Sequence, residues 1–100
     1  MWIRSQNRLY ICNLDNIDCI TNSYNLNLKD DRIELSAFNQ KEKTVLGYYQ
    51  TKERAIEVLD EICNAYISLN KQVGKEYRGN NPSGYFGGYV KNGVYQMPEV

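Results

Sequence analysis

One long amphipathic helix, predicted over residues 51–73, constrains the fold more than any other feature of the sequence. Thr51 can cap its first turn, and Glu53 places a carboxylate where the helix dipole favours negative charge. An apolar stripe follows at spacings of three and four residues, made of Ala55, Leu59, Ile62, Tyr66, Leu69 and Val73. The stripe is widened on one flank by Ile56, Cys63 and Ile67. So wide an apolar face needs a sheet beneath it, and the extra width predicts contact with a second copy or with the C-terminal segment.

Strand patterns fill the fifty residues before this helix. Short runs of β-forming or alternating residues lie at 2–6, 9–12, 17–20, 24–28, 33–37 and 44–49. The two alternating runs in the middle are joined by an Asp-rich break, which is typical of a hairpin. About five short strands in sequence order predict an antiparallel meander.

Glycine changes the character of the chain after the helix. Gly74 predicts the helix end, and residues 74–89 hold five of the seven glycines together with four aromatic side chains. Asn92-Gly93 then separates two short β-rich runs, and this dipeptide favours a two-residue hairpin turn.

The sequence therefore predicts a single α+β domain over residues 1–100. Its sheet is expected over 1–50 as the meander and its helix over 51–73. A glycine- and tyrosine-rich loop with a C-terminal β-hairpin is expected over 74–100. One hundred residues are enough for one hydrophobic core.

The chain has no histidine, and this limits its chemistry. Histidine is the usual general base near neutral pH and the commonest metal ligand, and its absence excludes Ser-His-Asp and Cys-His arrangements. Carboxylates cluster at Asp30-Asp31 and at Glu57-Asp60-Glu61, where we interpret them as solvated charges. The glycine-rich loop lacks the Gly-Lys-Ser/Thr ending of a phosphate-binding loop. We therefore expect no enzyme activity, no catalytic residues, no metal and no cofactor.

Charge and cysteine usage bear on partners and location. Twelve basic and twelve acidic side chains balance, which argues against binding to a nucleic-acid polymer. Cys12, Cys19 and Cys63 are an odd number without a C-x-x-C pair, and we interpret them as small buried hydrophobic residues. The sequence shows no signal peptide or membrane-spanning stretch, so a soluble cytoplasmic protein without a membrane partner is expected.

Aromatic, basic and amide side chains gather in one segment near the C-terminus. Aromatic faces stack on bases, arginine pairs with phosphate, and asparagine hydrogen-bonds base or ribose edges. Arg54, near the helix start, lies opposite the apolar stripe on a helical wheel, which predicts that it projects from the core and can hold an anion. The candidate ligand-binding residues are Arg54, Tyr77, Arg78, Tyr85, Phe86 and Asn92. The alternative is that the tyrosines pack the hairpin and that Arg54 is an ordinary exposed arginine.

Four segments carry a resemblance: residues 1–6 (MWIRSQ), 46–55 (LGYYQTKERA), 58–62 (VLDEI) and 94–98 (VYQMP). Through them the chain resembles a family of small proteins of phages, prophages and integrative elements of Gram-positive bacteria. Its architecture is also similar to that of the Thoeris anti-defence sponge proteins, which trap cyclic ADP-ribose isomers as oligomers.

The resemblance implies a phage-derived anti-defence protein in the host cytoplasm. Such a protein would be a homodimer or higher homo-oligomer that sequesters a nucleotide-derived signalling molecule, a cyclic ADP-ribose isomer or a cyclic oligonucleotide, for immune evasion without chemistry. Two alternatives stay open: an anti-CRISPR-like protein–protein inhibitor of a host defence effector, and a binding module of a mobile element.

Overall fold

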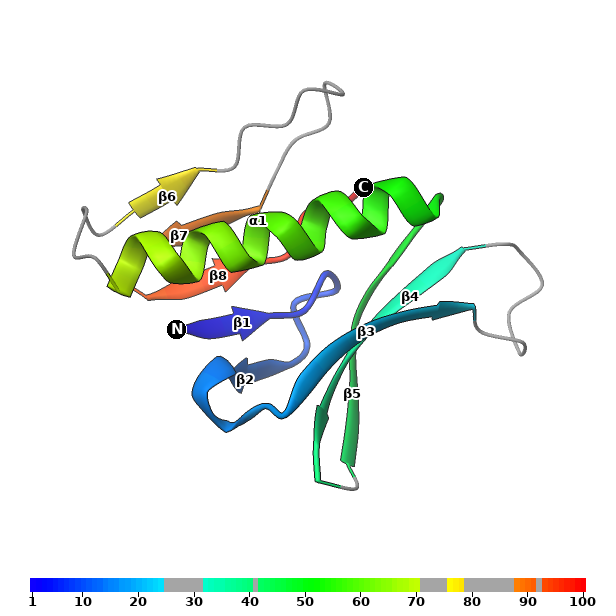
Figure 1. Cartoon of the computed structure of the whole chain (residues 1–100), viewed down its shortest axis with the longest axis horizontal. Helices are drawn as coiled ribbons and strands as arrows, with labels where there is room; N and C mark the ends of the chain where they lie inside the picture. Colours follow the sequence, from blue (N-terminus) through cyan, green and yellow to red (C-terminus); the bar gives the residue numbers. More distant parts are fainter. Residues whose placement is uncertain (25–31, 41, 71–75, 79–87, 92) are drawn as a thin grey trace.

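The computed structural model describes residues 1–24, 32–40, 42–70, 76–78, 88–91 and 93–100 (Figure 1). In chain order its elements are β1 (Trp2–Arg4), β2 (Ile11–Asn13), a 3-10 turn (Leu14–Asn16), β3 (Cys19–Tyr24), β4 (Ile33–Asn39), β5 (Glu42–Tyr49), α1 (Lys52–Asn70), β6 (Glu76–Arg78), β7 (Tyr89–Lys91) and β8 (Val94–Gln96). The predicted α+β class is confirmed, with N-terminal strands, one long helix and a hairpin near the C-terminus.

The strands form two sheets. A five-stranded sheet has the order β2-β1-β8-β7-β6, and a three-stranded sheet has the order β3-β4-β5. Five N-terminal strands, β1 to β5, are present, but they are divided between the two sheets and do not form one continuous meander. Strand β1 runs parallel to β8, with Ile3 opposite Tyr95. A pair of short strands is only marginally stable on its own, and the C-terminal strand β8 supplies a second neighbour for β1.

The three-stranded sheet contains the predicted strand at 33–37 as part of β4, whereas its predicted hairpin partner at 24–28 lies, after Tyr24, outside the described residues. Strands β3 and β4 are antiparallel, with Tyr24 opposite Ile33, and the Asp-rich connection at 25–31 lies outside the described residues. The residues from Ile33 to Ala37 are all buried, so β4 is the central strand of this sheet in packing as well as in order.

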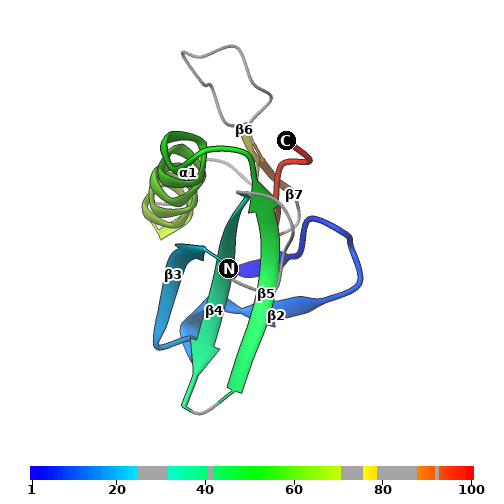
Figure 2. The same cartoon turned by 90° about the vertical axis from the view of Figure 1, so that its right-hand side faces the viewer.

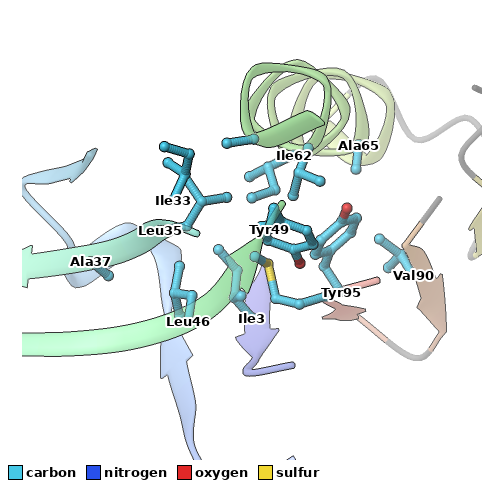
Figure 3. Packing of buried hydrophobic residues seen from close by; sticks show 13 residues of the cluster. Ile3, Ile33, Leu35, Ala37, Leu46, Tyr49, Ile62, Ala65, Val90 and Tyr95 are labelled. Atoms are coloured by element: carbon cyan, nitrogen blue, oxygen red, sulfur yellow. The ribbon is translucent and has the colours of Figure 1, made fainter. Parts of the chain in front are cut away.

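Helix α1 covers the core where the two sheets meet. Figure 3 shows Ile62 and Ala65 of the helix above Leu35 and Tyr49 of one sheet and Tyr95 of the other. Thr51 caps the helix as predicted, because its Oγ1 accepts a hydrogen bond of 3.1 Å from the Arg54 backbone N–H.

The buried side of α1 is rotated relative to the predicted stripe. Ala55 and Ile62 are buried as predicted, whereas Leu59 and Tyr66 are only half-buried. The other fully buried apolar positions are Val58 and Ala65, and the predicted flank of Ile56, Cys63 and Ile67 is exposed. Small side chains at the contact let a helix approach the strands closely, and a rule based on large apolar residues misses this.

Two predictions about polar positions were wrong. Glu61 is buried rather than solvated, because the Tyr95 hydroxyl donates a hydrogen bond of 2.6 Å to its Oε1. Cys19 and Cys63 are exposed, and Cys12 is half-buried, so these cysteines are not all core residues. Burial raises the pKa of the Cys12 thiol.

The C-terminal hairpin is confirmed in β7 and β8, which pair antiparallel with Val90 opposite Tyr95. Gly93 in its turn has φ of 80°, which a residue with a side chain adopts only with strain. Gly88, just before β7, has no room for a side chain, since an added Cβ would lie 2.4 Å from the Tyr95 hydroxyl oxygen. None of the helices in the described part of the chain is long and apolar enough to cross a membrane.

Candidate functional site

A pocket of about 380 Å³ lies where the end of β5, the first turn of α1 and the segment after β8 meet. This volume falls in the range of pockets that bind small molecules. Its lining residues are Gln6, Arg32, Tyr48, Tyr49, Gln50, Thr51, Arg54, Glu99 and Val100.

Gln6 builds one wall by completing the edge of β5. Its backbone N–H donates to the Leu46 carbonyl at 2.6 Å, and its side-chain Oε1 accepts from the Tyr48 N–H at 2.9 Å. The side-chain Nε2 donates to the carbonyl oxygens of Tyr48 at 3.0 Å and Glu99 at 2.7 Å. Gln6 therefore hydrogen-bonds the free backbone groups at the edge of β5 and also binds the segment after β8 to that edge.

Arg54 lies in the first turn of α1 and is only 3% exposed. Its Nε and Nη2 both donate to the Val100 backbone oxygen, at 2.9 and 2.7 Å, and its Nη1 lies 3.3 Å from Glu57 Oε2. The prediction that Arg54 projects from the core was wrong, because the segment after β8 folds back over this side of the helix. A helical wheel takes no account of a covering segment 45 residues away in sequence.

Two arginine–tyrosine pairs line the pocket, and their tyrosines are adjacent in sequence. The Arg32 guanidinium carbon lies 4.9 Å from the centroid of the Tyr48 ring, and that of Arg54 lies 5.8 Å from the Tyr49 ring. Both distances are those of cation–π contacts. Strand alternation sends Tyr48 and Tyr49 to opposite faces of β5, so the two pairs approach the pocket from different sides.

Tyr49 also fixes the floor of the pocket. Its ring is 1% exposed, and its hydroxyl donates a hydrogen bond of 2.8 Å to the Pro98 carbonyl. Burial raises the pKa of Tyr49 well above its usual range; nearby Arg54 lowers it and Glu61 raises it by smaller amounts. The phenol is therefore neutral at physiological pH and acts as a hydrogen-bond donor.

The pocket's chemistry is suited to binding. Its charged side chains are Arg32, Arg54 and Glu99, and Arg54 is paired with Glu57. The Thr51 hydroxyl already accepts a hydrogen bond from the helix backbone, and among the described lining residues none pairs a nucleophile with a base. The described residues also contain no cluster of three or more side chains able to hold a metal ion.

The other candidate residues from the sequence lie elsewhere. Tyr77 and Arg78 are in β6, opposite Val90 and Tyr89. This strand lies beside the C-terminal half of α1, away from the first turn that carries Arg54 (Figure 1). The structure therefore does not bring these two positions together with Arg54. The remaining candidates, Tyr85, Phe86 and Asn92, lie outside the described residues.

Sequence reasoning missed most of the pocket, namely Gln6, Arg32, Tyr48, Tyr49 and Glu99. One signal pointed to it. Three of the segments that carry the family resemblance, at 1–6, 46–55 and 94–98, are far apart in sequence and meet around this pocket. A search for binding residues among them would have found Gln6, Tyr48 and Tyr49.

Comparison of the chain with protein-family models, with curated proteins and with solved structures gives no match in any of the three. The chemistry of the pocket is therefore the basis for assigning a function.

Proposed function

We propose that this protein is a non-catalytic binding protein that sequesters a small anionic molecule of nucleotide type in the pocket at the start of α1. The observation that carries this proposal is the placement of two arginine–tyrosine pairs, Arg32 with Tyr48 and Arg54 with Tyr49, around one cavity of about 380 Å³.

Each part of such a ligand has a counterpart in the pocket. Arg32 and Tyr48 are half-buried and supply a guanidinium group for phosphate oxygens and a ring face for a base. Arg54 and Tyr49 are buried, and they form the floor beneath the ligand. The backbone N–H groups of the first turn of α1 lie at the end of the helix that borders the pocket, and they favour a negatively charged ligand there. The volume is near the lower end of the range for ligand pockets, which favours a cyclic ADP-ribose isomer or a mononucleotide over a larger cyclic oligonucleotide.

The biological role that fits this chemistry is the anti-defence role implied by the family resemblance. In it, a phage-derived protein in the host cytoplasm, assembled as a homo-oligomer, removes a nucleotide immune signal by holding it intact. The exposed flank of Ile56, Cys63 and Ile67 on α1 supports self-association, because it is an apolar strip that its own chain leaves uncovered.

Calorimetry with a panel of cyclic ADP-ribose isomers and cyclic dinucleotides tests the proposal. Arg32→Ala should weaken the binding of an accepted ligand at least tenfold, and the loss should shrink as salt screens the phosphate contact. Arg4→Ala is the matched control, because Arg4 is exposed and does not line the pocket. Heating the loaded protein should release the ligand chemically unchanged. If no member of the panel binds, or the ligand is released cleaved, sequestration of this class is excluded.

A protein–protein inhibitor is the second candidate. Leu9 and Tyr10, in the connection between β1 and β2, are 76% and 55% exposed, and two large apolar side chains at such a tip suit insertion into a partner. A target captured by the wild-type protein and lost with Leu9→Asp, with nucleotide binding absent, would favour this function.

A further inference from the structure

The segment after β8 runs from the five-stranded sheet to the pocket, and the way it is attached changes along its length. Met97 is fully buried, and its backbone N–H donates to the Arg4 carbonyl at 3.1 Å. Pro98 is buried too, and its carbonyl accepts a hydrogen bond of 2.8 Å from the Tyr49 hydroxyl. Figure 2 shows the end of this segment, in red, beside the end of β5 from which the chain leads into α1. The segment is therefore anchored in the core as far as Pro98.

Residues 99 and 100, called the strap below, are held in a different way. Glu99 and Val100 are exposed, and the exposed fraction of Val100 is 60%. Hydrogen bonds to the backbone hold them: Gln6 Nε2 donates to the Glu99 carbonyl at 2.7 Å, and Arg54 donates to the Val100 oxygen. Because most of the Val100 side chain stays in solvent, little apolar burial is lost when the strap is released. The strap can therefore be released while the anchored part of the segment stays in place.

The contact between Arg54 and the strap has the geometry of anion recognition. Nε and Nη2, which form one edge of the guanidinium group, both donate to the Val100 backbone oxygen, at 2.9 and 2.7 Å. An edge of this kind binds a carboxylate or a phosphate through two parallel hydrogen bonds. The third nitrogen, Nη1, lies 3.3 Å from Glu57 Oε2. The strap thus occupies two donors that a phosphate group in the pocket would use.

The strap also forms part of the pocket wall. Glu99 and Val100 line the cavity together with Arg54, and Arg54 is only 3% exposed beneath them. A ligand held by Arg32 and Tyr48 would share this cavity with the strap. Glu99 adds a carboxylate to the wall, which disfavours a second anion nearby. A phosphate-bearing ligand and the strap therefore compete for the same place.

We propose that the strap is a built-in competitor for the Arg54 donors, and that a phosphate-bearing ligand binds tightly only after it displaces Val100 from Arg54. This inference rests on the proposed function, because it concerns the regulation of the same pocket. With the strap closed, Arg54 belongs to the pocket floor; with the strap released, it is a second phosphate contact beside Arg32. The apparent affinity equals the intrinsic affinity multiplied by the fraction of molecules with an open strap, so the strap sets the ligand concentration at which the pocket fills.

Calorimetry with inorganic pyrophosphate tests the anion contact without a base or a sugar. The double substitution Glu99→Gly with Val100→Gly keeps the backbone oxygens of the strap, but glycine raises the conformational entropy of the released state. Glu99→Gln is the matched control, because it removes the same charge and keeps the stiffness of the strap. The double variant should bind pyrophosphate about tenfold more tightly than this control.

Nitrogen-15 relaxation measures the displacement of the strap directly. Saturation of the wild-type protein with pyrophosphate should lower the order parameter of the Val100 backbone N–H to below about 0.6, the range of flexible chain. The Met97 N–H is the control within the same segment. It is anchored to β1 and should stay near about 0.85 with and without pyrophosphate.

A change at Arg54 assigns the effect to its guanidinium edge. In an Arg54→Lys background the two glycine substitutions should increase pyrophosphate affinity much less, because an ammonium group has no such pair of parallel donors. Circular dichroism should show that each variant keeps the wild-type fold.

Either of two results would overturn the inference. The first is a double glycine variant that binds pyrophosphate no more tightly than Glu99→Gln, or not at all. The second is a Val100 N–H that stays ordered in the saturated complex, because the anion would then bind without displacing the strap. A nucleotide that binds while Val100 stays ordered would support the proposed function and remove the strap. Pyrophosphate that displaces Val100 from a protein that binds no nucleotide would do the reverse.

Discussion

The pocket and the face of the five-stranded sheet that carries Arg4 and Tyr89, called here the outer sheet face, contain the same residue types in different environments. In the pocket, Arg54 and Tyr49 are 3% and 1% exposed. On the outer sheet face, Arg4 is exposed and Tyr89 is 42% exposed. The two regions are joined through the same strands, because β1 and β8 contribute to the sheet and lead directly into the walls of the pocket.

The difference lies in what holds each side chain. Val100, Glu57 and Pro98 occupy the polar groups of Arg54 and Tyr49, so these two side chains hold the fold together as well as lining a cavity. A substitution in the pocket therefore changes stability and binding at once. A substitution of the exposed Arg4 or of Tyr89 should change stability much less, and paired variants of the same residue type measure this difference.

The largest difference in stability is expected between the alanine variants of Tyr49 and Tyr89. Tyr49→Ala removes a buried ring and should lower the free energy of unfolding by about 3–5 kcal/mol. Tyr89→Ala removes a side chain that is 42% exposed, and its cost should stay within about 1 kcal/mol. Urea denaturation of both variants measures this difference. Equal losses would show that Tyr89 is part of the core and that the distinction between the regions is false.

Substitution of Arg54 should destabilise the protein more than substitution of Arg4, by a smaller margin than for the two tyrosines. Arg54→Ala removes a buried side chain together with its hydrogen bonds to Val100 and its ion pair with Glu57, and should destabilise the protein by about 1–3 kcal/mol. Arg4→Ala should have little effect on the midpoint temperature of thermal unfolding. Thermal unfolding of the two variants in parallel checks this, and Arg54→Lys should recover only part of the loss, because an ammonium group cannot reproduce the guanidinium fork.

The sequence predicted the local elements well and their assembly only in part. Capping by Thr51, the hairpin around Gly93 and the run that became β5 all follow from interactions within a few residues, and each is confirmed. The pairing of β1 with β8 joins residues more than 90 positions apart. No local pattern contains that information, and the division of the strands into two sheets depends on it.

The candidate site shows the same limit. Arg54 lines the pocket, but it is buried there, whereas the sequence predicted that it faces solvent. The choice of the glycine- and tyrosine-rich segment rested on side-chain types in one stretch of sequence. The pocket instead collects its residues from five separated stretches, and only the tertiary fold defines which of them meet.

A third prediction uses pH to examine the pocket floor. Since burial raises the pKa of Tyr49, the folded protein keeps this phenol proton at a pH where the unfolded chain, with an ordinary pKa of about 10, has lost it. Stability should therefore fall as pH rises above about 10, by up to about 1.4 kcal/mol per pH unit from this group.

Tyr49→Phe has no such proton. It should be less stable than wild type by about 1 kcal/mol at neutral pH, through the lost hydrogen bond to Pro98, and the two curves should converge above pH 10. Parallel curves would mean that Tyr49 is not buried as described.

The smallest energetic effect is expected for Cys63, and it bears on self-association. Because Cys63 is exposed, Cys63→Ala should change the free energy of unfolding by less than about 0.5 kcal/mol. Alkylation of the native protein should be fast at Cys63 and Cys19 and slower at Cys12, where partial burial and a raised pKa reduce the reactive thiolate.

Cys63 lies between Ile56 and Ile67 on the exposed flank of α1, so its reactivity can locate the predicted homodimer contact. If a second copy covers this flank, alkylation of Cys63 should slow as protein concentration rises, while Cys19 on β3 serves as the control within the same molecule. Ile67→Asp should abolish the concentration dependence and convert the oligomer to a monomer in sedimentation, because a carboxylate cannot be buried in an apolar contact without a partner. An oligomer whose Cys63 reacts at the same rate at every concentration would place the contact elsewhere. Such a result would direct the search for the contact to the open strand edges of the two sheets.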